Sequence, residues 1–184
     1  MLYPLGRKSS CCQTAIGARP VVALLALGFM LGLTNVSNAQ SGPVERFSVD
    51  SGLHRAAHLG DVVSLHRELD AETDPNAINR FGVTPLSLAC TGGHVEAITL
   101  LLNAGADPNH ASPSGETPLM VAARTGVIDS VVALLEHGAD PLARESWMGQ
   151  TALMWAAAER HVGVIAPLVE AGADVNRRTD SGFT

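Results

Sequence analysis

The stretch that decides the fold reads GETPLMVAARTGVIDSVVALLEHGADP, from Gly115 to Pro141. It contains two short apolar segments with helical spacing. Thr117 is suited to cap a helix that begins at Pro118, because the N–H that proline lacks has no intrahelical partner at that position. Gly126 suits the left-handed turn that ends a helix. The stretch therefore predicts two consecutive helices, the second of which ends at Gly138.

The same pattern occurs three times along the chain. Aligned on Leu119, it returns upstream as VTPLSLACTGGHVEAITLLLNAGADPN (83–109) and downstream as QTALMWAAAERHVGVIAPLVEAGADVN (150–176). Steps of 33, 33 and 34 residues separate Leu53, Leu86, Leu119 and Leu153. Below roughly 40 residues, a lone unit without metal or disulfide seldom buries enough surface to fold. Each unit is therefore expected to bury its apolar side against a neighbour, as stacked repeats do.

The repeated unit resembles the ankyrin repeat, whose consensus opens on Thr-Pro-Leu-His-x-Ala-Ala-x-x-Gly-His and closes on Gly-Ala-Asp-x-Asn. Three good copies open at Thr84, Thr117 and Thr151. A degenerate first copy keeps LHRAAHLGDV but lacks Thr-Pro, as a terminal unit can. The resemblance implies an all-α solenoid of stacked helix-turn-helix units with projecting hairpin loops, called fingers below.

Period and resemblance together divide the chain into segments. They are a signal peptide (1–39), a linker (40–50), a degenerate repeat (51–82), three repeats (83–115, 116–149 and 150–182) and the start of a further unit (183–184). The last letters, SGFT, fall where earlier units open. We therefore expect the sequence to be a fragment of a longer protein.

The N-terminus has the pattern of an export signal. Three basic residues precede or flank a 13-residue apolar run, Val21 to Leu33, and the small residues Ser37 and Ala39 suit a cleavage site. This predicts cleavage after Ala39 and a periplasmic or secreted protein. The alternative is an uncleaved anchor, although 13 residues fall short of the roughly 20 that span a bilayer as a helix. All nine basic residues after Ala39 are arginine, which suggests a bacterium with a GC-rich genome.

The charge and the motifs argue against several classes of function. Beyond residue 39 the chain has 18 acidic and nine basic residues, a formal net charge of −9, which does not suit a nucleic-acid partner. It contains no glycine-rich phosphate loop and no Gly-x-Ser-x-Gly elbow. Periodic aspartates are interpreted as caps on backbone amides in turns, and these are Asp74, Asp107, Asp140 and Asp174. We expect no catalysis, no cofactor and no small-molecule substrate.

Three histidines lie close enough in the sequence to be candidate metal ligands. His54 and His58 are four residues apart on a predicted helix, and His66 follows nearby. No acidic residue is obviously placed to complete the set, and the resemblance implies a packing and hydrogen-bonding role at the His54 position. We therefore predict no metal site. Cys90 takes a small-residue position on a helix and is predicted to be a buried, unreactive thiol.

The resemblance places partner binding on the finger tips and on the exposed concave side of each first helix. The candidate contacts are Arg80, Phe81, Ser112, Ser114, Arg144, Glu145, Trp147 and Met148 on fingers, and Thr91, Arg124, Thr125 and Glu159 on helices. Asp140 and Thr151 are 11 positions apart, one more than the equivalent pairs in the two earlier fingers. Trp147, beside this extra residue, is either a binding anchor or a side chain folded over the neighbouring finger. Trp155 replaces leucine or valine on a first helix and is predicted to lie in the core.

The last two units depart from the pattern in three places. Leu142 replaces the closing asparagine of the unit at 116–149. In the unit at 150–182, Arg160 replaces a turn glycine, and Pro167 lies inside the second helix, where it should kink the helix or shift its start. The function expected from the whole sequence is a non-catalytic scaffold that binds a partner protein. The alternative is the regulatory or targeting arm of a larger enzyme whose catalytic domain lies beyond Thr184.

Overall fold

The computed structural model describes residues 51–182. The expected signal peptide (1–39), linker (40–50) and start of a further unit (183–184) lie outside the described residues. Within residues 51–182 the chain forms eight helices and no strand. The helices are α1 (Gly52–Leu59), α2 (Val62–Asp70), α3 (Pro85–Gly92), α4 (Val95–Asn103), α5 (Pro118–Thr125), α6 (Ile128–Glu136), α7 (Ala152–Ala158) and α8 (Val162–Glu170). The expected all-α repeat solenoid is confirmed.

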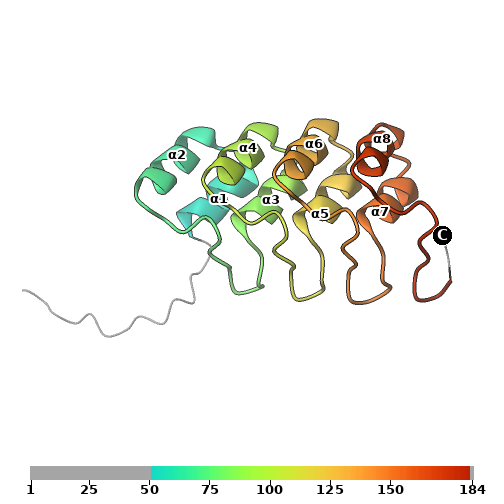
Figure 1. Ribbon diagram of the computed structural model, residues 1–184. Helices are drawn as coiled ribbons and strands as arrows, with labels where there is room; N and C mark the ends of the chain where they lie inside the picture. The colour runs from blue at the N-terminus through green and yellow to red at the C-terminus, as the bar shows by residue number, and fades with distance from the viewer. Residues whose placement is uncertain (1–50, 183–184) are drawn as a thin grey trace, which may run out of the picture. The chain divides into compact units, whose positions relative to one another are not determined.

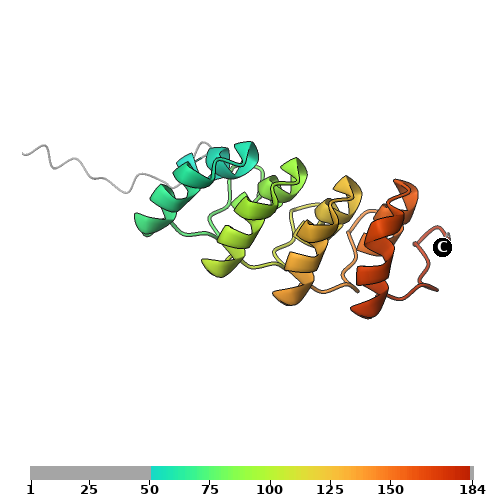
Figure 2. The same ribbon diagram turned by 90° about the horizontal axis from the view of Figure 1, so that it is seen from above.

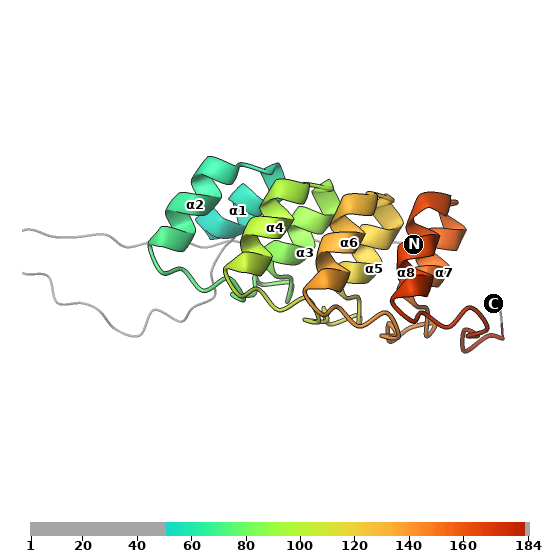
Figure 3. The same cartoon turned by 45° about the horizontal axis from the view of Figure 1, so that its top comes forward.

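The helices stand in two rows (Figure 1). One row consists of α1, α3, α5 and α7, each packed on the next, and the other of α2, α4, α6 and α8 in the same order (Figures 2 and 3). Three fingers connect successive helix pairs and project from the same edge of the stack, and we call them the first (74–83), second (107–116) and third (140–150) finger.

Hydroxyl caps start each helix of the first row. The Oγ1 of Thr117 accepts the N–H of Met120, and Ser51, Thr84 and Thr151 cap their own helices in the same way. Proline occupies the first position of α3 and α5. A cap of this kind contributes about 1 kcal/mol, which matters for helices of only seven or eight residues.

A left-handed residue ends each of these helices. Gly60, Gly93 and Gly126 have φ of 68°, 67° and 75°, and Arg160 takes the same place with φ of 61°. In this region a residue with a Cβ is strained by about 1 kcal/mol or more, whereas glycine is not. The last repeat thus keeps the turn in spite of an unsuitable residue.

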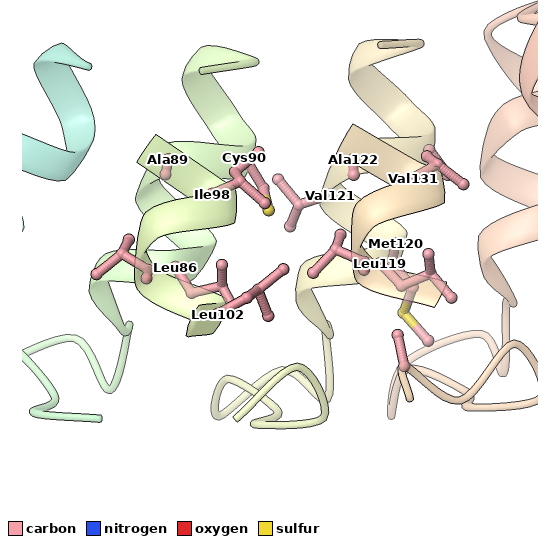
Figure 4. Packing of buried hydrophobic residues seen from close by; sticks show 14 of the residues in the cluster. Leu86, Ala89, Cys90, Ile98, Leu102, Leu119, Met120, Val121, Ala122 and Val131 are labelled. Atoms are coloured by element: carbon pink, nitrogen blue, oxygen red, sulfur yellow. The ribbon is translucent and has the colours of Figure 1, made fainter. Parts of the chain in front are cut away.

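The core lies in layers between neighbouring helix pairs. Leu53, Leu86 and Leu119 are at most 1% exposed, and Ala89 and Ala122 are fully buried. Figure 4 shows buried side chains of α3 to α6 lying within and on both sides of two neighbouring helix pairs. Burying one leucine stabilises the fold by about 1.5–3 kcal/mol.

The last repeat shows which positions face the following repeat in the stack. Ala157 is exposed, although its equivalents Cys90 and Ala123 are fully buried. Leu153 is half-buried, whereas Leu119 is 1% exposed. Ala157 therefore lies outside the layers between repeats, because no unit among residues 51–182 packs against that face.

Pro167 does not shift the start of α8. The helix begins at Val162, which is equivalent to the start of α6 at Ile128, and it has nine residues like α2, α4 and α6. Val164 and Leu168 are fully buried on either side of the proline. Their burial anchors the helix in register despite the lost backbone donor.

The periodic aspartates cap the turns, as predicted. The Oδ1 atoms of Asp74, Asp107, Asp140 and Asp174 each accept the backbone N–H two residues later, at 2.8–2.9 Å. These bonds fix the bend that leads from each second helix into the segment that follows. The aspartates are accordingly part of the scaffold.

Asparagine side chains bridge neighbouring repeats at this bend. The Nδ2 of Asn76 donates to the Gly105 carbonyl at 3.0 Å, and its Oδ1 accepts the Asp107 N–H at 2.7 Å. Asn109 makes the same pair of bonds to Gly138 and Asp140, at 2.9 and 2.8 Å. We call this arrangement the carboxamide bridge. Leu142 occupies the third equivalent position and has no side-chain group that could form it.

Candidate partner-binding surface

The third finger is organised around one buried carboxylate. Glu145 is 6% exposed, and its two oxygens accept the backbone N–H groups of Trp147, Met148 and Gln150 at 2.5, 2.7 and 3.0 Å. Burial raises the pKa of Glu145, but the hydrogen bonds from these amides and from that of Gly149 outweigh it and hold the pKa below its ordinary value. Glu145, predicted as a partner contact, is instead the group that holds the loop together.

Trp147 stands at the tip of this finger with its side chain free. The residue is 84% exposed, while its backbone N–H is fixed by Glu145. The interpretation of Trp147 as a side chain folded over the neighbouring finger is therefore wrong. Met148 beside it is 38% exposed. A fixed backbone reduces the conformational entropy that a loop loses when it binds, so this tryptophan is presented in a preorganised form.

The first finger carries a second exposed aromatic residue. Phe81 is 60% exposed, and the guanidinium carbon of Arg80 lies 4.7 Å from the centre of its ring. Such a cation–π contact is worth about 0.5–1 kcal/mol at an exposed site. Arg80 and Phe81 therefore form one joint surface feature at the fingertip.

The second finger is polar. The hydroxyls of Ser112 and Ser114 lie 2.8 Å apart, and the Oγ of Ser112 also accepts the N–H of Glu116. The carbonyl of Ser114 accepts the N–H of Ser146, which joins the second finger to the third. The two serines thus separate the aromatic tips of the first and third fingers with a hydrogen-bonded surface.

Arg144 is engaged within the chain. Its Nη2 lies 2.6 Å from the Asp180 carboxylate, and its Nε donates to the Gly149 carbonyl at 3.0 Å. The backbone N–H of Asp180 also donates to the Met148 carbonyl. Arg144 consequently ties the third finger to the segment after α8, and its charge is partly neutralised.

The predicted contacts on helices divide into two kinds. Thr91 and Thr125 donate their hydroxyls to carbonyls of their own helices, those of Ser87 and Ala122. Arg124 and Glu159 are exposed. Only the latter two carry side-chain groups that are free of such an internal bond.

Arg124 and Glu159 line a hollow of about 200 Å³ between α5 and α7, together with Gln150, Ala158 and Trp155. The Arg124 guanidinium carbon lies 4.9 Å from the centre of the Trp155 ring. Trp155 is half-buried, so its predicted place in the core is wrong. Its equivalent, Val121, is buried, but an indole is far larger than the isopropyl group and extends to the surface. The hollow could have been suspected only from this bulky residue at a position that is leucine or valine in the two preceding repeats.

The side chains of three histidines on different helices or turns make hydrogen bonds to neighbouring groups. The Nδ1 of His54 lies 2.6 Å from the Ser51 hydroxyl and its Nε2 lies 3.1 Å from the Val83 carbonyl. His94 reaches the His58 carbonyl at 3.1 Å, and His161 reaches that of Arg124 at 2.9 Å. In the part of the chain that the structure describes, no group of three possible ligands is arranged to hold a metal ion.

Comparison with known proteins decides the family. A model of ankyrin repeats in three copies matches residues 53–145, and a model of a single ankyrin repeat matches residues 148–180. The chain belongs to the ankyrin repeat family. Its ankyrin repeats are similar to Cyclin-dependent kinase 4 inhibitor B of Mus musculus, with 43% identity over 54 residues, 29% of this chain and 42% of that protein. The same protein of Rattus norvegicus is 42% identical over 52 residues, 28% of this chain and 40% of the relative.

The matched part therefore spans about two fifths of the length of these relatives. Such a match supports the ankyrin repeat as a structural unit. Among residues 51–182 of this ankyrin repeat protein, none of the helices has the length and apolar character needed to cross a bilayer.

Proposed function

We propose that this chain is a non-catalytic scaffold that binds a partner protein through its finger tips and the adjoining surface of α3, α5 and α7. One observation carries the proposal: Trp147 is 84% exposed on a finger whose backbone is fixed by the buried Glu145. Because the side chain of an exposed tryptophan is not packed in the free protein, it gives up no favourable contacts on binding. In a complex it buries a large apolar area. Tryptophan is among the residues most enriched at the energetic centres of interfaces.

Other exposed side chains on the fingers and helices support the same proposal. Phe81 and Met148 add apolar area, and Arg80 lies against the Phe81 ring. On the helices, Arg124, Glu159 and Trp155 line a hollow that offers a positive group, a negative group and an aromatic ring. Aromatic residues, methionine and arginine are the types enriched in protein interfaces. Ankyrin repeats typically mediate binding between proteins, and the two relatives carry the name of a kinase inhibitor, a protein that acts on another protein.

The test compares two exposed apolar side chains. The full chain, Trp147→Ala and Val63→Ala are immobilised, and partner proteins from the organism's exported fraction are captured and titrated. Val63 is 80% exposed on α2, away from the fingers, and serves as the matched control. We expect Trp147→Ala to weaken the complex by at least about 2 kcal/mol with an unchanged melting temperature, whereas Val63→Ala binds like the parent. Equal binding by all three proteins contradicts the proposal.

The compartment is a second part of the proposal. We propose export to the periplasm or the exterior of a bacterial cell, on the strength of the apolar run from Val21 to Leu33 and the small residues before Gln40. Intact-mass measurement of the protein recovered outside the cytoplasm is expected to show an N-terminus at Gln40. A mass that includes residues 1–39 contradicts cleavage and favours the uncleaved anchor.

A further inference from the structure

The joint between the repeats at 116–149 and 150–182 differs from the two joints before it. At the earlier joints an asparagine carboxamide donates to a glycine carbonyl and accepts the N–H of the aspartate two residues later, with distances of 2.7–3.0 Å. At the last joint the equivalent partners are the carbonyl of Gly172 and the N–H of Asp174. Among residues 51–182 neither of these two groups has a hydrogen-bond partner.

The backbone that would receive the carboxamide is nevertheless formed. The N–H of Ala173 donates to the Leu168 carbonyl at 2.9 Å, as Ala106 and Ala139 do at their joints at 3.0 Å. The Oδ1 of Asp174 accepts the N–H of Asn176 at 2.9 Å, so the turn is capped like its equivalents. The acceptor and the donor are therefore held in the same kind of bend as at the occupied joints.

Space for a ligand exists beside these two groups. A hollow of about 360 Å³ is lined by Leu142, Thr151, Gly172, Asp174 and Arg177. Leu142 lines this hollow and is itself 55% exposed. Its apolar surface forms one side of the hollow, and the guanidinium of Arg177 contributes a charged donor.

We propose that this joint binds a primary carboxamide, presented by an asparagine or glutamine side chain of a partner protein. The chain itself shows the fit, since Asn76 and Asn109 fill the two equivalent joints with this group. A primary carboxamide carries an N–H on the same side as its carbonyl oxygen, so one group can reach an acceptor and a donor that lie next to each other. The N–H and C=O of a trans peptide unit point in opposite directions and cannot do so.

A carboxylate does not suit the site. It has no proton to donate to the Gly172 carbonyl, and it would lie beside the carboxylate of Asp174. The hollow therefore discriminates between asparagine and aspartate, which have nearly the same shape. This inference goes beyond the fingertip binding proposed above, because none of the groups that form the site is Trp147 or part of the α5–α7 hollow.

The test follows backbone amides by ¹⁵N–¹H correlation spectra of the labelled full chain. The probe is the capped dipeptide acetyl-Asn-Leu-N-methylamide, and its matched control is acetyl-Asp-Leu-N-methylamide. We expect the Asp174 amide signal to shift in a saturable way with the asparagine probe and not with the aspartate probe. The Asp107 and Asp140 amides are internal controls, because asparagine side chains already occupy them.

Variants separate filling of the site from loss of the leucine. Leu142→Asn lets the chain supply its own carboxamide, so the response of the Asp174 amide is expected to disappear. Leu142→Ala leaves the site open, and the response is expected to persist. Trp147→Ala is also expected to keep it, which distinguishes this proposal from the fingertip site. The inference is overturned if the Asp174 amide does not respond, if it responds equally to both dipeptides, or if Leu142→Asn responds like the parent.

Discussion

At the second and third joints of the stack, equivalent helices pack together but different polar interactions connect the repeats. The joint before residues 83–115 has the bridge from Asn76, and the joint before residues 116–149 has the same bridge from Asn109. At the joint that follows, Leu142 removes the bridge, and the Arg144–Asp180 ion pair connects the repeats. The His161 contact to Arg124 at this joint is the equivalent of the His94 contact to His58 at the first joint. Asp180 has a side chain that is 63% exposed, and exposed ion pairs typically contribute about 0–1 kcal/mol. The apolar layers thus carry most of the stacking energy, and polar ties can be exchanged.

The largest effect is expected from a charge placed in the buried layer between repeats, compared with the same charge at the equivalent exposed position. Ala123→Glu places a carboxylate in a fully buried position, whereas Ala157→Glu places it at the equivalent exposed position. Burying an unpaired charge is expected to destabilise the fold by several kcal/mol, enough to unfold a marginal domain. Thermal unfolding of the two variants should show a large drop in melting temperature for Ala123→Glu and almost no change for Ala157→Glu. Similar shifts would refute the assignment of this position to the layer between repeats.

The turn between the two helices of each repeat gives the next largest effect. Gly126 has φ of 75°, and a Cβ there would meet the His161 ring, so Gly126→Ala is expected to cost about 2 kcal/mol. Arg160 already takes this conformation with a side chain, so Arg160→Gly should relieve about 1 kcal/mol of strain. Denaturant unfolding measures both changes. A destabilised Arg160→Gly variant would mean that the arginine side chain makes a compensating contact.

The carboxamide bridge provides a reciprocal pair of changes of similar or smaller size. Asn109→Leu removes two hydrogen bonds, and Leu142→Asn restores them at the third joint. Each bond contributes about 1 kcal/mol net, so the first variant should lose, and the second gain, about 2 kcal/mol. Denaturant midpoints of the single and double variants check the symmetry. A Leu142→Asn variant no more stable than the parent would show that the third joint cannot close the bridge.

The smallest expected effect concerns the third finger and acid. The pKa of Glu145 is depressed in the folded protein, so its carboxylate stabilises the fold above the ordinary glutamate pKa of about 4.3. This contribution is lost as the pH falls through the folded-state pKa. Glu145→Gln should therefore reduce stability near neutral pH and flatten its decline below about pH 4.3. Urea unfolding between neutral and acid pH compares the two proteins, and parallel curves would contradict the role of the carboxylate.

The repeats were predictable because their signals are local and periodic. Thr117 caps α5 and Gly126 ends it, and both act on backbone groups within a few residues. The aspartate caps recur with the repeat and were recognised as scaffold for that reason. Leu142 and Arg160 were visible as departures, but their consequences depend on groups in the next repeat or on the backbone dihedral.

The candidate surface was less predictable because fingers vary and lack a period. Glu145 was placed among the exposed contacts, since nothing local indicates that its carboxylate folds back onto the amides of Trp147, Met148 and Gln150. Trp155 was placed in the core from its position alone, but the size of the indole brings it to the surface beside Arg124. In both residues the outcome depends on three-dimensional space that sequence spacing does not measure.

The fully buried Cys90 is a natural probe of how often the layer around it opens. It is the equivalent of the forward-facing Ala123, and burial raises the pKa of its thiol, so the reactive thiolate is suppressed in the closed stack. A thiol reagent can modify Cys90 only while the surrounding layer is open. The rate of modification, followed by peptide mass, therefore reports how often the second and third repeats separate and close again.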